Sequence, residues 1–311
     1  MPVRTPSGND RRPPRHVAPT SVAQLTRRRF LAASAVGVTA AGVGYGGYRG
    51  VKALVDSSSS LLHQIEGATG TDISGTFFSR FRRQTVGYTL GYPEGHGPGS
   101  HLPLIVFMHG YGSSHKHALA GFTPGSATSL QINGRPLTPM ALVTVDGGGG
   151  YWHPHPGDDP LGMIVHELIP MMRARGLGRS PHSIAAMGIS MGGYGAINMA
   201  EHLPGLVNAV AAISPAIFAS YDHVHYVNPG AYWSAADFDK YNAISHASLL
   251  GHKPVRVASG SSDPFHPWVE EFTTQLPATD PVFYPPGAHD GDFFHSQIAP
   301  SMAFLSQHLA T

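Results

Sequence analysis

The chain has 311 residues, no cysteine and nearly balanced charge, with 20 Lys and Arg against 19 Asp and Glu. Without cysteine it can form neither a disulfide nor a lipoprotein-type anchor. Residues 1–52 contain nine Lys or Arg and one Asp, so this leader carries +8 and the remainder −7, which argues against nucleic acid as a partner because phosphate binding needs clustered cations.

The leader contains Thr-Arg-Arg-Arg-Phe-Leu at positions 26–31, followed by a weakly apolar stretch of Ala, Gly and Val that ends near residue 47. This pattern resembles a twin-arginine export signal and predicts an extracellular, cell-wall or periplasmic protein. No clear Ala-x-Ala cleavage site follows, so a retained membrane anchor and a basic arm that binds something anionic stay open. A serine-containing linker, residues 53–70, then leads into one domain, residues 71–311.

Short apolar runs separated by Gly- and Pro-containing turns predict the strands of this domain. They lie at residues 77–83, 86–92, 104–108, 141–145, 183–187, 207–213, 255–259 and 282–284. Helical patterns fall between them, notably at 161–175, 194–203 and 295–309. This alternation predicts an α/β fold, a mostly parallel sheet with helices on both faces and the functional site at the carboxyl ends of the strands.

Ser190 stands between two glycines in the pentapeptide Gly-Ile-Ser-Met-Gly at 188–192, directly after a predicted strand and before a predicted helix. That context is what a nucleophile elbow requires, because glycine at the flanking positions lets strand and helix approach closely. The serine would then be exposed at the turn, at a helix N-terminus that favours negative charge.

A serine hydroxyl becomes nucleophilic when a base takes its proton and a carboxylate orients that base. Asp263 follows the predicted strand 255–259, and His289 follows the strand 282–284. The chain order Ser190, Asp263, His289 is the order of the α/β-hydrolases. We therefore predict these three residues as nucleophile, acid and base.

Rival candidates exist for the acid and for the base. Asp290 and Asp292 are too close in sequence to His289 to lie at the end of a separate strand, while Asp263 itself could simply start a turn before a proline. His266 and His295 are the rival bases, and the position of His295 within an apolar helical pattern favours a place in the C-terminal helix.

From about residue 77 onward the chain resembles the putative-esterase branch of the α/β-hydrolases, which includes esterase D-like carboxylesterases and, more distantly, the antigen 85 mycolyltransferases. The matching pieces are His-Gly-Tyr-Gly at 109–112, Gly-Ile-Ser-Met-Gly-Gly-Tyr-Gly-Ala at 188–196, Ser-Pro-Ala at 214–216, Gly-Ser-Ser-Asp-Pro at 260–264 and Gly-Ala-His-Asp at 287–290. The resemblance implies an α/β-hydrolase fold and a serine hydrolase that acts on esters. It further implies an oxyanion hole made by the backbone N–H groups of Tyr111 and Met191, with Gly110 as a further donor.

Two insertions are expected to shape the substrate pocket. The first, residues 146–159, contains four consecutive glycines that predict mobility, and the adjoining Tyr151 and Trp152 offer an apolar wall. The second, residues 218–250, lies where this fold commonly carries a small cap and includes Tyr232 and Trp233. We predict these four aromatic residues as substrate contacts, although aromatic residues at this density also simply pack against one another.

The 20 histidines suggest metal binding, and two His-x-His pairs occur, at 153–155 and 223–225. Neither pair has a third ligand at a metallohydrolase spacing, so we predict no metal and no cofactor. The function predicted is an exported or membrane-tethered serine esterase for a small-molecule or lipid-like ester. An acyltransferase that passes the acyl group to a sugar or lipid hydroxyl is the first alternative, and a non-catalytic binding protein with this fold is the second. The oligomeric state stays open.

Overall fold

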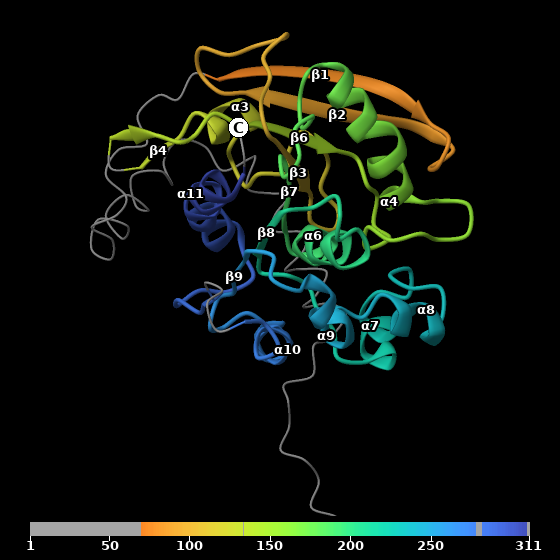
Figure 1. Cartoon of the computed structure of the whole chain (residues 1–311). Coiled ribbons are helices and arrows are strands. Elements are labelled where there is room, and N and C mark those ends of the chain that lie inside the picture. The colour runs from red at the N-terminus through yellow and green to blue at the C-terminus, as the bar shows by residue number, and fades with distance from the viewer. Residues whose placement is uncertain (1–69, 133, 278–281, 310–311) are drawn as a thin grey trace, which may run out of the picture.

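The computed structural model describes residues 70–309 apart from residue 133 and residues 278–281 (Figure 1). The leader, with the predicted export signal, and nearly all of the linker lie outside these residues. The centre of the described part is an eight-stranded sheet with the order β1-β2-β6-β3-β7-β8-β9-β10. Its strands are β1 (Thr71–Ser79), β2 (Gln84–Tyr92), β3 (Leu104–Met108), β6 (Ala141–Val145), β7 (Ile184–Ile189), β8 (Ala209–Ile213), β9 (Val255–Ala258) and β10 (Val282–Phe283). β1 and β2 pair antiparallel, as do β2 and β6, and all other pairs are parallel.

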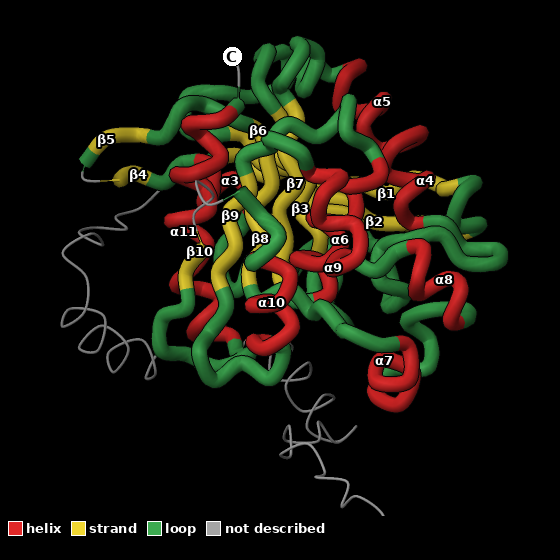
Figure 2. Tube along the Cα trace, turned by 60° about the horizontal axis from the view of Figure 1, so that its bottom comes forward, coloured by secondary structure: helices red, strands yellow, loops and turns green. Residues whose placement is uncertain are grey.

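Helices cover both faces of this sheet (Figure 2). One face carries α3 (Pro124–Thr128) and α11 (Gly291–His308). The other carries α4 (Pro160–Met163), the π-helical turn η1 (Ile164–Leu168), α5 (Ile169–Ala174) and α6 (Met191–His202). Within the described residues, no helix is both long and apolar enough to cross a membrane. The predicted α/β fold with a mostly parallel sheet is confirmed.

The two-sided cover explains why the central strands read as unbroken apolar runs. In β3, Leu104, Val106 and Met108 belong to the core on the α6 side, whereas Ile105 and Phe107 belong to the core on the α11 side. Successive side chains of a strand point to opposite faces, so a strand covered twice must be apolar at every position.

The first strand differs from the prediction at both ends. β1 runs over Thr71–Ser79 and not over 77–83, because residues 80–83 form the turn into β2, where Arg83 has a φ of 54°. Polar and half-buried residues alternate along this edge strand, so its first half lacks the apolar run by which the other strands were found. A short ribbon of β4 (Gln131–Ile132) and β5 (Arg135–Pro136) was also missed.

The insertion after β8 is helical. It contains α7 (Tyr221–Val227), α8 (Ala235–Lys240), α9 (Ala243–His246) and the 3-10 turn η2 (Ala247–Leu250), and α10 (His266–Thr273) follows β9. α9 and η2 pack against α6, whereas α7 and α8 lie farther out, in the lower right of Figure 1. The Tyr194 hydroxyl of α6 donates a 2.6 Å hydrogen bond to the carbonyl of Tyr241, which anchors the insertion to the helix that begins after Ser190.

The turn from β7 to α6 passes through Ser190, whose φ of 56° and ψ of −120° are unfavourable for a residue with a side chain. Two glycines make this turn possible. A Cβ atom at Gly192 would lie 1.9 Å from the carbonyl oxygen of Met108, and one at Gly188 would lie 2.2 Å from the carbonyl oxygen of Gly192. No side chain fits at either position, as the sequence pattern predicted. The Ser190 amide donates to the carbonyl of Ile213 at 2.9 Å, which holds the turn against β8.

Glu201, near the end of α6, is a buried carboxyl group. Its side chain is 2% exposed, and neither oxygen has a hydrogen-bond partner among the described residues. Burial raises the pKa of Glu201 well above its ordinary value. The folded protein therefore holds a proton at this site that the unfolded chain releases above pH 4.5.

A folded-state pKa that is raised means that stability is lost as the pH rises. We expect Glu201→Gln to match the stability of the parent protein near pH 4. Above pH 4.5, and up to the raised pKa of Glu201, the variant should become more stable than the parent by up to about 1.4 kcal/mol per pH unit. Urea unfolding at pH 4, 5.5 and 7 measures this difference. Glu270→Gln, a change at an exposed position of α10, is the control. A difference between Glu201→Gln and the parent that does not vary with pH contradicts the prediction.

Candidate active site

Three side chains that are far apart in the sequence form one hydrogen-bonded line. His289 Nε2 lies 2.8 Å from Ser190 Oγ, and His289 Nδ1 lies 2.8 Å from Asp263 Oδ2. An ionised carboxylate only accepts hydrogen bonds, so Nδ1 carries the imidazole proton and Nε2 accepts from the serine hydroxyl. The structure thus brings together the three residues predicted as nucleophile, base and acid, in the geometry of an activated serine.

Each member of this line comes from the carboxyl end of a parallel strand. Ser190 follows β7, Asp263 follows β9, and His289 follows β10 by a longer loop. The second carboxylate oxygen of Asp263 accepts a 2.9 Å hydrogen bond from the Phe265 amide, which fixes the carboxylate plane. The His289 ring lies between Phe265 and Phe294, with both ring centroids at 5.0 Å. These two aromatic rings and the two hydrogen-bond partners leave the imidazole one orientation.

The rival residues lie in other environments. The Asp290 side chain accepts from the Phe293 amide at 2.9 Å and so caps α11. Asp292 is exposed in the first turn of that helix. His295 bonds to the carbonyl of Ala120 from an exposed position on α11. His266 lies on α10 with its ring edge-on to Tyr284, 4.7 Å between centroids.

The loop after β3 lies against Ser190. A Cβ atom at Gly110 would be 3.5 Å from the Cβ of Ser190, so the backbone of this loop approaches the serine closely. Tyr111, the next residue, is half-buried. Met191 is the first residue of α6, and the N–H groups of a first helical turn have no partner within the helix. These positions correspond to the amides predicted to face the oxygen of a reacting ester.

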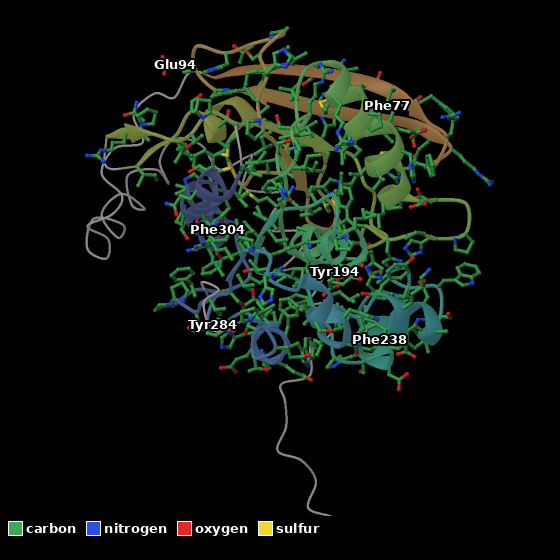
Figure 3. The ribbon with its side chains drawn as sticks, in the orientation of Figure 1. Phe77, Glu94, Tyr194, Phe238, Tyr284 and Phe304 are labelled. Carbon is green, nitrogen blue, oxygen red and sulfur yellow. The ribbon has the colours of Figure 1, made fainter. Side chains whose placement is uncertain are left out.

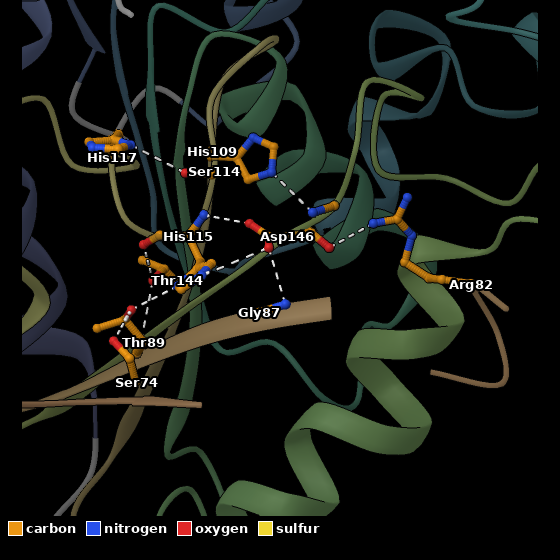
Figure 4. Close-up of polar contacts among 11 residues, drawn as sticks. Ser74, Arg82, Gly87, Thr89, His109, Ser114, His115, His117, Thr144 and Asp146 are labelled. Carbon is orange, nitrogen blue, oxygen red and sulfur yellow. Dashed lines mark hydrogen bonds and ion pairs between the residues drawn. The ribbon is translucent and has the colours of Figure 1, made fainter. Parts of the chain in front are cut away.

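His109 holds this loop in place (Figure 4). Its Nδ1 lies 2.8 Å from the carbonyl of Gly110, and a carbonyl only accepts, so Nδ1 carries the proton. Its Nε2 then accepts a 3.0 Å hydrogen bond from the Gly147 amide. Burial lowers the pKa of His109 below its ordinary value, which keeps the ring neutral as these two bonds require.

Asp146 lies directly after β6 and connects three segments. This structural role was not predicted from the sequence. Its carboxylate accepts from the His115 amide at 2.8 Å and from the Gly87 amide at 3.1 Å. Its carbonyl accepts from Arg82, which also binds Asp158 with two bonds of 2.7 and 2.8 Å. The signal that was available is a carboxylate immediately after a buried parallel strand, the place where polar residues of this fold class gather.

The structure corrects two of the four predicted substrate contacts. Tyr151 and Trp152 are both 0% exposed, so neither ring is accessible to a substrate. The two residues have φ values of 53° and 59°, and this backbone conformation turns both rings inward. Trp152 Nε1 donates to the carbonyl of His109 at 3.1 Å. Tyr151 packs against Tyr194 of α6 and against the rings of Phe218 and Tyr232, which belong to the insertion after β8. Trp152 therefore supports the loop after β3 and Tyr151 supports α6, both from the core side.

The other two predicted contacts, Tyr232 and Trp233, line a pocket of about 360 Å³ together with His155 and His225. Tyr232 is nearly buried, whereas Trp233 is 70% exposed. The lining does not include Ser190 or its two partners. This pocket therefore lies between the insertion after β8 and the loop after β6, and it is separate from Ser190.

The His153 and His155 pair packs among aromatic rings. His153 is stacked on His155, Tyr232 and Tyr241 at centroid distances of 4.5, 4.7 and 4.7 Å, and its Nε2 bonds to the carbonyl of Ala231. Burial, assisted by the neighbouring His155, lowers the pKa of His153 to about 4. Within the described part of the chain, no group of three or more His, Asp or Glu side chains is arranged to hold a metal ion.

Solved structures share this fold at low identity. A ferulic acid esterase superimposes with a TM-score of 0.60 at 17% identity, covering 78% of this chain and 100% of its own. An S-formylglutathione hydrolase from Agrobacterium tumefaciens gives 0.60 at 16%, covering 81% and 100%. MPT51 of Mycobacterium tuberculosis gives 0.61 at 15%, covering 78% and 100%. No curated protein sequence matches the chain.

The sequence itself matches one family model. The family described as "Putative esterase" matches residues 83–284, which is more than half of the chain. The matched span includes Ser190 and Asp263 and ends five residues before His289. The chain therefore belongs to this esterase family.

Proposed function

We propose that this protein is a serine esterase that forms an acyl-enzyme on Ser190. His289 Nε2 takes the hydroxyl proton of Ser190 as Oγ attacks the carbonyl carbon of an ester. Asp263 keeps the proton of His289 on Nδ1 and stabilises the imidazolium that forms. The backbone N–H groups of Tyr111 and Met191, with Gly110 beside them, stabilise the negative charge on the ester oxygen.

Collapse of the tetrahedral intermediate breaks the bond to the alcohol, which leaves with the proton from His289. Water then enters, His289 takes one of its protons, and the attack on the acyl carbon releases the carboxylic acid and restores Ser190. These steps use side chains and backbone groups of the chain alone and require no cofactor.

The observation that supports this proposal best is the line of two 2.8 Å hydrogen bonds through His289, which ends on a serine held in left-handed backbone geometry. A buried serine packed for structure alone needs neither feature. Small-molecule esters are the substrate class proposed, because the fold neighbours include a ferulic acid esterase and the rings of Phe265 and Phe294 border the base.

We expect Ser190→Ala to lower turnover of p-nitrophenyl esters by about 10⁴-fold or more, because no other hydroxyl can form the acyl-enzyme. Labelling with a fluorophosphonate, followed by peptide mapping, tests the same residue directly. Ser214→Ala is a matched control. Ser214 also has a positive φ, of 44°, and its buried hydroxyl has no hydrogen-bond partner among the described residues.

A chain-length series and methyl ferulate, each with and without an alcohol acceptor, identify the acyl group and what removes it. Release to water supports an esterase, whereas preferential transfer to the alcohol supports the acyltransferase. If Ser190→Ala keeps most of the activity, or if the probe labels another residue, the assignment is wrong. If the parent protein is neither labelled nor active, the non-catalytic binding protein is favoured.

Asp263→Asn is expected to reduce turnover at least 100-fold, since an amide no longer holds the imidazole in the reactive tautomer. Asp290→Asn and Asp292→Asn serve as controls, because one side chain caps α11 and the other is exposed. Steady-state kinetics on the three variants decide between the carboxylates. An effect below about tenfold for Asp263→Asn, combined with a larger loss in either control, reassigns the acid.

We further propose that the leader directs export by the twin-arginine route. The support is the sequence Thr-Arg-Arg-Arg-Phe-Leu at 26–31 ahead of a weakly apolar stretch. This segment lies outside the described residues.

Replacing both Arg27 and Arg28 by Lys is expected to stop export while leaving the charge of the leader unchanged. The matched control replaces the pair Arg11 and Arg12 by Lys, which makes the same chemical change outside the motif. Fractionation of cells that produce the full chain measures the result. Normal export of the Arg27 and Arg28 variant contradicts the signal and favours a plain membrane anchor.

A further inference from the structure

A second cavity lies at the far edge of the sheet from β1. It is a groove of about 530 Å³ between the strands β9 and β10 and the helix α11. Its walls are mostly apolar and include Phe283, Tyr284, Pro300 and Phe304. Figure 3 shows Phe304 and Tyr284 on the same side of the molecule. Ser190, Asp263 and His289 do not line the groove, so it is separate from the proposed catalytic site.

Arg256, on β9, supplies the charged group of the groove. Its side chain is 4% exposed. The guanidinium donates to Ser301 Oγ and to Gln297 Oε1, both at 2.9 Å, and its central carbon lies 4.9 Å from the ring centroid of Phe283. Among the described residues, no carboxylate forms an ion pair with Arg256, so the partners of its guanidinium there are neutral groups.

A buried cation without an anion is unfavourable, because it has lost water and gained no opposite charge. The same loss of water lowers the pKa of Arg256 to about 10. Holding the two sides of the groove together does not explain the charge, since a neutral amide could make the same contacts to Ser301 and Gln297. A guanidinium has five N–H donors in a planar fork, and only two of them bond to residues that the structure describes. The fork matches the two oxygens of a carboxylate.

The surface beside Arg256 indicates what the carboxylate is attached to. Phe283 is half-exposed on the short edge strand, and Pro300 and Phe304 extend the apolar wall along α11. An apolar body lying on these rings would cover them and exclude water from the guanidinium, which strengthens the charge interaction. An inorganic anion would contact the fork and leave the apolar wall exposed.

We propose that this groove is an accessory binding site for a small amphipathic monocarboxylate, whose carboxylate pairs with Arg256 and whose alkyl or aryl body lies against Phe283 and Phe304. The site does not depend on the proposed esterase activity.

The test is calorimetric titration of the full chain with octanoate and with 1-octanol, which has the same chain length and no charge. We expect octanoate to bind at least tenfold more tightly than 1-octanol, and Arg256→Met to remove that difference. Arg256→Lys should bind octanoate with intermediate affinity, because it keeps the charge and loses the fork. Arg175→Met is the matched control, since Arg175 also lies over an aromatic ring, 5.8 Å from the centroid of Tyr88, outside the groove.

Phe283→Ser changes a half-exposed side chain and should weaken octanoate binding without unfolding the protein, so the groove is tested even if Arg256→Met does not fold. Far-ultraviolet circular dichroism and thermal unfolding establish that each variant is folded. Equal binding of octanoate and 1-octanol, no binding of octanoate, or a folded Arg256→Met with unchanged octanoate affinity overturns the proposal. Octanoate binding lost equally in Arg175→Met overturns it as well.

Discussion

The site depends on one backbone contact, between the end of β3 and the first turn of α6. The carbonyl of Met108 lies where a side chain at Gly192 would begin, so helix and strand touch without side chains between them. Because the loop at residues 109–112 starts directly after Met108 and α6 starts directly after Ser190, this contact also sets the distance between that loop and the serine. The positive φ of Ser190 is the strain that this close approach imposes. Any side chain at Gly192 would therefore displace Ser190 and the backbone of the loop after β3 together.

Neutral and charged groups share the work of holding the loops around the serine. His109 is kept neutral by burial and joins the loop after β3 to the loop after β6 by a donor on one nitrogen and an acceptor on the other. Asp146 and Arg82 extend this connection to the antiparallel edge of the sheet, through β2 and the turn that precedes it. β2 and the turn before it therefore help to hold the loop after β3, which lies on the other side of β6.

The pattern of apolar runs, followed each time by a polar residue, allowed the fold and the grouping of Ser190, Asp263 and His289 to be predicted, because parallel strands end at one edge of the sheet. The inward direction of Tyr151 and Trp152 was not predictable, since two consecutive positive φ values at residues other than glycine leave no signal in the sequence. Arg256 was missed for a related reason. A single cation within a short apolar strand resembles an exposed position, and only the packing of α11 shows that it is buried. The first half of β1 lacks an apolar run, so the start of that strand was missed as well.

The four consecutive glycines at 147–150 resemble a hinge, but large side chains lie directly on them. A Cβ atom at Gly147 would meet the Trp152 ring at 2.1 Å, and one at Gly149 would meet the Tyr111 ring at 2.9 Å. The missing side chains leave space that the rings of Trp152 and Tyr111 fill, so these glycines serve close packing and not a hinge. For protein engineering, these glycines are therefore poor positions for substitution. A side chain introduced at Gly147 or Gly149 would push away the ring of Trp152 or Tyr111, and with it the loop after β3 that lies against Ser190.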